Sequence, residues 1–162
     1  MDYYGTAYNI PVFLKVDGQF EIDRMQSAVD RLVSENEILR TSFHMVDGEI
    51  VQKVHEDARL LIDYCEMDES AEVLYDFLKS MIKPFSLQDA PLMRINIVKH
   101  NEGNYLLAVD MHHIISDGLS NVLMMERLFK YYNEPSCEKD IAPLQYKDYA
   151  NWMVHKDFSN ER

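Results

Sequence analysis

Two neighbouring apolar segments constrain the fold more than any other feature of this sequence. Residues 92–99 and 105–111 both have the pattern of β-strands, and a polar turn around residues 101–104 joins them. The second segment is apolar at nearly every position, which is typical of a strand inside a sheet with both faces covered. Because helices must cover those faces, the chain is expected to form an α/β sandwich in a single domain.

The rest of the chain alternates strand and helix patterns, without a linker or an internal repeat. Asp47-Gly48 is a strong signal for a two-residue β-hairpin turn. Ser70 is suited to cap a helix that runs to Pro84, and another helix is expected to start near Gly118. The apolar positions of that last helix are Leu119, Val122, Leu123, Leu128 and Phe129. The other expected strands are 8–16, 38–46, 49–54 and 60–65, and the other expected helices are 21–36 and 144–157.

Charge and composition limit the classes of partner. The formal net charge of −12 repels phosphate, which argues against a nucleic acid partner. No apolar run approaches the roughly 20 residues that cross a bilayer, and the first residues lack the pattern of a signal peptide, so no membrane association is expected. Cys65 and Cys137 form no disulfide framework and no CxxC pair, which favours a cytoplasmic location.

The strongest candidate for chemistry is the segment at residues 111–118. His112 and His113 close an apolar strand, and Asp117 and Gly118 open a helix. Successive side chains of an extended segment point to opposite sides, so one histidine can enter a cleft while the other turns inward. A neutral imidazole can take a proton from an attacking amine or hydroxyl group. Asp117 can orient the imidazole, pair with a cation or cap the helix, and Gly118 leaves room for a close backbone approach.

The same residues can also have purely structural roles. The histidines can be satisfied core residues, with Asp117 as a helix cap and Gly118 as a turn residue. No further ligand stands at metal-binding spacing, so no metal site is expected. The glycine-rich loops that bind nucleotides are also absent from the sequence.

Four segments, in this order, resemble the condensation domains of nonribosomal peptide synthetases. MHHIISDGLS at residues 111–120 is similar to the HHxxxDG signature of that family. The other three are ENEILRTSF at 35–43, similar to RHExLRTxF, KPFSLQDAPLMR at 83–94, similar to PFDLxxxPLxR, and YKDYANW at 146–152, similar to YxDYAxW.

The resemblance implies a fold like that of chloramphenicol acetyltransferase. In that fold two similar subdomains, each a mixed β-sheet covered by helices, form a V with the active-site tunnel between them. Residues 1–162 are expected to be the N-terminal subdomain. The family's opening SxAQxR segment is missing before Tyr3, and the C-terminal subdomain is missing after Arg162. The half-domain is therefore expected to fold alone but to be inactive by itself.

The resemblance also implies the reaction and the residues that serve it. An acceptor aminoacyl group attacks a donor thioester, and His113 deprotonates or positions the acceptor's α-amine. His112 and Gly118 are expected to shape the loop, and Asp117 to form an ion pair with Arg40. The domain itself is expected to bind no cofactor. Both substrates are carried on 4'-phosphopantetheine arms of donor and acceptor carrier proteins, with an adenylation domain and the C-terminal subdomain as further partners.

Several positions depart from the family pattern. Glu35-Asn36 replaces its usual arginine-histidine pair, Leu119 stands where tryptophan is frequent, and Ser86 replaces a carboxylate. Three rival functions remain: half of an epimerization domain, a coenzyme A-dependent HxxxD acyltransferase, and a noncatalytic module that docks carrier proteins. The paired histidines argue against a cyclization domain, whose motif is acidic at these positions.

Overall fold

The structure, a computed structural model, describes residues 5–138 and 144–156 and divides them into six strands, four α-helices and one short 3-10 helix. The strands are β1 (Asn9–Asp17), β2 (Thr41–Val46), β3 (Glu49–Val54), β4 (Ile62–Glu66), β5 (Met93–Asn101) and β6 (Asn104–His112). The helices are α1 (Ile22–Glu35), η1 (Glu37–Arg40, the 3-10 helix), α2 (Ala71–Ser80), α3 (Gly118–Asn133) and α4 (Tyr146–His155).

The central sheet has four strands in the order β1-β6-β5-β4. β6 pairs antiparallel with both β1 and β5, whereas β4 runs parallel to β5 and reaches it through α2. The predicted interior strand is confirmed: β6 lies between two partners, and residues 107–111 are all buried. The sheet is therefore mixed, and its two central strands are the two apolar segments of the sequence.

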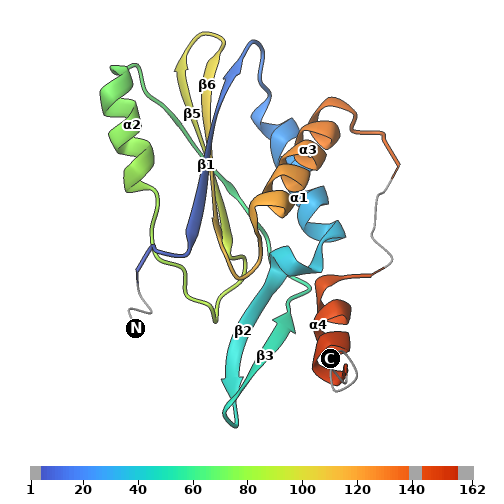
Figure 1. Cartoon of the computed structure of the whole chain (residues 1–162). Coiled ribbons are helices and arrows are strands. Elements are labelled where there is room, and N and C mark those ends of the chain that lie inside the picture. The colour runs from blue at the N-terminus through green and yellow to red at the C-terminus, as the bar shows by residue number, and fades with distance from the viewer. Residues whose placement is uncertain (1–4, 139–143, 157–162) are drawn as a thin grey trace.

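Helices cover both faces of this sheet. α1 and α3 pack together on one face, and α2 lies on the opposite face (Figure 1). The larger core joins α1 and α3 to the sheet through residues such as Leu32, Leu128 and Val109. The smaller core places Leu74 and Leu78 of α2 against the other face. Within the described ranges, no helix combines the length and the apolar character needed to span a membrane.

The hairpin of β2 and β3 forms a separate two-stranded sheet that extends away from the central one, with α4 beside it (Figure 1). Its turn confirms the prediction, because Asp47 (φ 51°) and Gly48 (φ 86°) both adopt the left-handed conformation that such a turn requires. The first strand begins later than expected. Residues 37–40 form η1 instead, and the Thr41 hydroxyl donates to the Glu37 carbonyl (2.7 Å) at its end.

Two helices differ from the sequence prediction. α2 begins after Ser70, whose hydroxyl accepts a hydrogen bond from the Val73 N–H as expected, but it ends at Ser80 rather than at Pro84. In α3 the first apolar residues of the expected stripe are exposed, and the helix buries a partly different set of residues. The exposed residues are Leu119 (70% exposed), Val122 (54%) and Leu123 (50%), and the buried ones are Asn121, Met124, Leu128 and Tyr131.

A buried polar contact joins α1 to α3. The Tyr131 hydroxyl donates to Glu35 Oε2 (2.5 Å), and Arg31 Nε donates to Glu35 Oε1 (2.9 Å). The Arg31 guanidinium also lies over the Tyr131 ring, 4.1 Å from its centroid. Glu35 is only 4% exposed, so these two donors help to satisfy its carboxylate inside the core.

This contact predicts a loss of stability at high pH. Burial, with the hydrogen bond to Glu35, raises the pKa of Tyr131 to about 12. In the unfolded chain a tyrosine ionises near pH 10, so the contribution is complete below pH 10 and is lost as the pH rises toward 12. The free energy of unfolding, measured by urea denaturation, should therefore fall more steeply above pH 10 in the native protein than in Tyr131→Phe. Parallel pH curves for the two proteins would contradict the assignment.

Candidate active site

The paired histidines lie where β6 ends and the loop to α3 begins. The backbone N–H of His112 donates to the Leu92 carbonyl (3.0 Å), and that of His113 donates to the Tyr8 carbonyl (2.8 Å). The Ile115 N–H then donates to the His112 carbonyl (3.1 Å), which turns the chain toward α3. Residues 112–117, which we call the histidine segment, are therefore held from both sides by the residues that precede β1 and β5.

His112 is turned into the structure. Its Nδ1 accepts a hydrogen bond from the Ile114 N–H (3.0 Å), so that nitrogen carries no proton. Its ring lies 5.9 Å from the Tyr8 ring and edge-on to the Phe85 ring at 6.2 Å. Burial, and to a lesser extent the neighbouring His113, lowers the pKa of His112. This imidazole is neutral near pH 7 and its Nδ1 is occupied by the loop backbone, so it fixes the path of the loop.

His113 points the other way and is exposed. No described residue forms a hydrogen bond with its ring. The two histidines thus divide as the alternation predicts, one inward and one outward. Of the pair, only His113 is placed to contact an incoming group.

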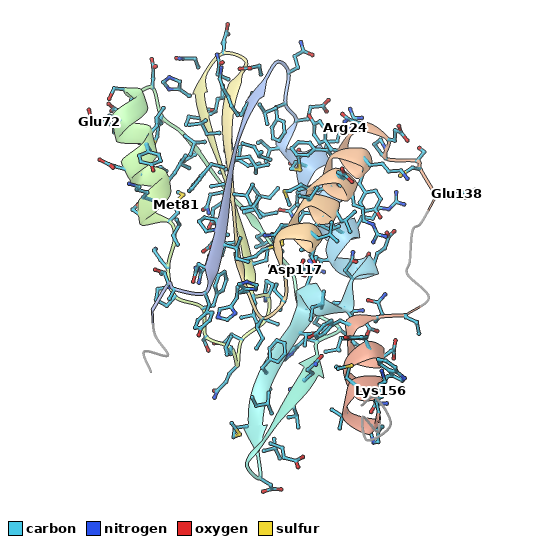
Figure 2. The ribbon with its side chains drawn as sticks, in the orientation of Figure 1. Arg24, Glu72, Met81, Asp117, Glu138 and Lys156 are labelled. Atoms are coloured by element: carbon cyan, nitrogen blue, oxygen red, sulfur yellow. The ribbon has the colours of Figure 1, made fainter. Side chains whose placement is uncertain are left out.

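Asp117 caps α3, and Figure 2 shows it at the N-terminal end of that helix. Its Oδ1 accepts hydrogen bonds from the Ser120 N–H and the Ser120 hydroxyl, both at 2.7 Å. These bonds lower the pKa of Asp117. The carboxylate is therefore ionised at neutral pH and is occupied by its own helix.

The expected ion pair between Asp117 and Arg40 is absent from the described residues, and that prediction is wrong. Arg40 Nη1 donates to the His55 carbonyl (3.4 Å), at the end of the hairpin. A helix cap needs only a residue three positions away, whereas the ion pair needs a guanidinium from another element. The local bond satisfies the Asp117 carboxylate first.

A double-mutant cycle checks this correction. Asp117→Ala should destabilise the protein by removing the cap of α3, and Asp117→Ser should retain most of the cap. Because the two side chains do not meet, the effects of Asp117→Ala and Arg40→Met on the free energy of unfolding should be additive. Urea denaturation of both single variants and the double variant measures the coupling energy between the two side chains. A large coupling energy would show that the ion pair does form.

Gly118 begins α3 with an ordinary helical backbone, and a Cβ at this position would meet no atom within 4 Å. The close backbone approach expected here is therefore not seen among the described residues. Gly118 instead lies at one end of a groove of about 650 Å³ between β1 and α3. The groove is lined mainly by apolar side chains, including Ile10, Val12, Leu14 and Val122.

Three residues that hold the histidine segment were not singled out from the sequence. The carbonyls of Tyr8 and Leu92 anchor its backbone, and the Phe85 ring packs on His112. Phe85 and Leu92 do lie in the segment at 83–94 that resembles a family pattern, but their contact with the histidines appears only in the folded chain. No group of three or more His, Cys, Asp or Glu in the described residues is arranged to hold a metal ion.

Comparisons with known proteins give a consistent family. A family model described as "Condensation domain" matches residues 1–162. Bacitracin synthase 2 of Bacillus licheniformis is 42% identical over 151 residues, which cover 91% of this chain and 6% of that protein. Surfactin synthase subunit 2 of Bacillus subtilis (strain 168) is 39% identical over 156 residues, which cover 96% of this chain and 4% of that protein. The chain thus spans less than a tenth of the length of these relatives.

Solved structures agree on the fold. The starter condensation domain of rhizomide synthetase superposes with a TM-score of 0.78 at 17% identity, covering 93% of this chain and 39% of that one. The X-domain from teicoplanin biosynthesis superposes with a TM-score of 0.77 at 22% identity, covering 91% of this chain and 33% of that one. These likenesses confirm the predicted fold class, in which a mixed sheet is covered by helices.

Proposed function

Because the chain belongs to the condensation-domain family of nonribosomal peptide synthetases, we propose that it carries the histidine-bearing part of an amide-forming acyltransferase. The acceptor is the α-amine of an aminoacyl group, and the donor is an acyl or peptidyl thioester. The amine nitrogen attacks the thioester carbonyl, the new C–N bond forms, and the C–S bond breaks. The departing thiolate takes up the proton that the amine gives away.

One observation carries this proposal: the His113 ring is exposed and unpartnered among the described residues, at the mouth of a buried strand, while His112 beside it is fixed inward. A neutral imidazole there can accept the amine proton or hold the amine in line with the thioester. An α-ammonium group has a pKa of about 7.7 to 8.0, so part of the acceptor is already neutral near pH 7. Accepting the amine proton and positioning the amine are therefore both chemically sufficient roles for His113 in amide formation.

The substrates in this proposal arrive on carrier proteins. The donor and the acceptor are each attached to the 4'-phosphopantetheine arm of a carrier protein, and an adjacent adenylation domain supplies the activated residue. The domain itself binds no further cofactor. The family match supports this arrangement because the relatives are large peptide synthetases, of which this chain corresponds to a small part.

The reaction also needs the rest of the domain. The solved condensation-type structures are longer, and this chain corresponds to 39% and 33% of two of them. Its exposed His113 and the apolar side chains of the first turns of α3 stand open to solvent. A second subdomain over this surface would exclude water and align the two substrate arms. We therefore expect residues 1–162 alone to be inactive.

A direct assay tests the proposal. The complete domain and the isolated chain are each supplied with a donor-loaded and an acceptor-loaded carrier protein, and the tethered product is identified by mass spectrometry. We expect amide product from the complete domain and none from the chain alone. Efficient product formation by the isolated chain would contradict the half-domain assignment.

The same assay separates the rival functions. Exchange of the acceptor's α-proton for deuterium without amide formation would identify an epimerization domain. Turnover with a coenzyme A thioester but not with a loaded carrier would identify an HxxxD acyltransferase. Carrier binding without any reaction would leave only a docking role.

A further inference from the structure

We propose that Arg94 is a positioning residue that sets the orientation of the histidine segment by clamping residues 83–85 beneath it. Arg94 belongs to the segment at 83–94 that resembles a family pattern but has no part in the chemistry proposed above. It stands near the start of β5, beside the end of β6 where His112 and His113 lie. The inference rests on the proposed function only in taking His113 as the reacting group.

Arg94 uses both ends of its guanidinium on one short stretch of backbone. Its Nη1 donates to the Lys83 carbonyl (2.6 Å), and its Nη2 donates to the Pro84 carbonyl (2.7 Å). The same guanidinium lies over the Phe85 ring, 3.7 Å from the centroid. A planar fork with fixed donors suits this triple contact, and a lysine ammonium on its flexible stem does not reproduce it.

A buried carboxylate ties this clamp to the histidine strand. Asp110 of β6 is 3% exposed, and its Oδ2 accepts hydrogen bonds from Asn9 Nδ2 (2.7 Å) and Arg94 Nη1 (3.3 Å). Asn9 Nδ2 also donates to the Lys83 carbonyl (2.9 Å). Asp110 pairs directly with Arg94 in the sheet register, two residues before His112. Residues of β1, β5 and β6 and the backbone carbonyls of Lys83 and Pro84 therefore meet in one polar network.

The network reaches the imidazole through Phe85. Phe85 is buried, and its ring contacts both the Arg94 guanidinium and the His112 ring, which is nearly perpendicular to it. His112 in turn accepts the Ile114 N–H, the bond that sets the path of the loop after His113. Asn9 follows Tyr8, whose carbonyl holds the His113 N–H. The Tyr8 anchor thus has Asn9 of this network as the next residue, and the Leu92 anchor has Arg94 two residues further on.

The position of His113 depends on these supports because its own ring has no hydrogen-bond partner among the described residues. Its aim is set only by the backbone that carries it. A displacement of about 1 Å in a reacting group can lower a rate about 10²-fold. Holding such a group through its neighbours is how a protein keeps it in place before the substrate arrives.

The test compares Arg94→Lys with Lys99→Met in the complete domain. Lys99 lies on the same strand at the far end of β5, where it pairs with Glu66, so it controls for a general weakening of the sheet. In Arg94→Lys we expect the Ile114 amide and the His112 ring nitrogens to shift in NMR spectra. We also expect kcat to fall about 10- to 100-fold with an unchanged KM for the acceptor carrier. Lys99→Met should leave the spectra of the histidine segment and kcat as they are.

Phe85→Leu keeps the test decisive if Arg94→Lys does not fold. Leucine fills the space beside His112 but removes the ring that Arg94 and His112 share, so the same NMR shifts and the same fall in kcat are expected. If the folded variants keep the native Ile114 and His112 signals and the native kcat, the positioning role is wrong. The NMR signals do not depend on catalysis, so NMR shifts in a domain that forms no amide would count against the proposed function and not against the clamp.

Discussion

Replacing His113 with alanine in the complete domain should lower the rate of amide formation by about 10²–10⁴-fold, the usual contribution of a positioned acid-base group. The side chain is exposed and its ring is unpartnered among the described residues, so alanine removes no hydrogen bond of the fold. Carrier binding and the free energy of unfolding should therefore stay close to native. Single-turnover assays with loaded carriers measure the rate, and unchanged turnover would end the catalytic assignment.

His100→Ala provides the matched control. His100 is a half-buried histidine near the end of β5 that lies at the opposite end of the sheet from Met93 and the histidine segment. It contacts the Met67 carbonyl, far along the chain from the loop at 112–117. Its loss should leave the rate of amide formation unchanged. A rate defect that appears only in His113→Ala is then specific to that side chain and does not follow from the loss of any one histidine.

His113→Asn separates the two chemical roles of the imidazole. An asparagine carbonyl can accept a hydrogen bond from the acceptor amine, but it cannot take a proton near pH 7. If His113 mainly holds the amine, asparagine should restore a large part of the rate that alanine loses. If it acts as a base, asparagine should be no better than alanine.

The second large effect is expected in the core. Leu128→Ala should lower the free energy of unfolding by about 2–5 kcal/mol, because this fully buried leucine packs α3 on the main core and alanine leaves a cavity. Leu123→Ala, on the same helix but 50% exposed, should change it by no more than about 0.5 kcal/mol. Urea denaturation of both variants tests the contrast. Similar losses would mean that both faces of α3 are packed.

Local signals in the sequence were enough for several elements. The turn at Asp47-Gly48, the cap at Ser70 and the interior strand at 105–111 follow from backbone preferences and from continuous apolar character. These features depend on residues close together in the chain. The outward His113 and the inward His112 also follow from the alternation of an extended segment.

Features that depend on distant contacts were missed or misread. Periodicity marks apolar residues of α3 but does not tell which ones face the sheet, so Leu123 looked equivalent to Leu128. Asp117 suited either a cap or an ion pair, and only the folded chain shows that Ser120 occupies it. The clamp of Arg94 on the Lys83 and Pro84 carbonyls has no local signal, since its partners lie in the loop before β5 and on β6.

The buried carboxylate of Glu35 limits how this chain can be recombined with its relatives. The family pattern usually has arginine where Glu35 stands, but here the carboxylate accepts the Tyr131 hydroxyl across 96 positions of sequence. A chimera with a crossover between α1 and α3 would take the two partners from different parents and leave one of them without its counterpart. Exchange points placed before Arg31 or after Tyr131 keep the pair together, and those are the junctions at which hybrid domains should remain stable.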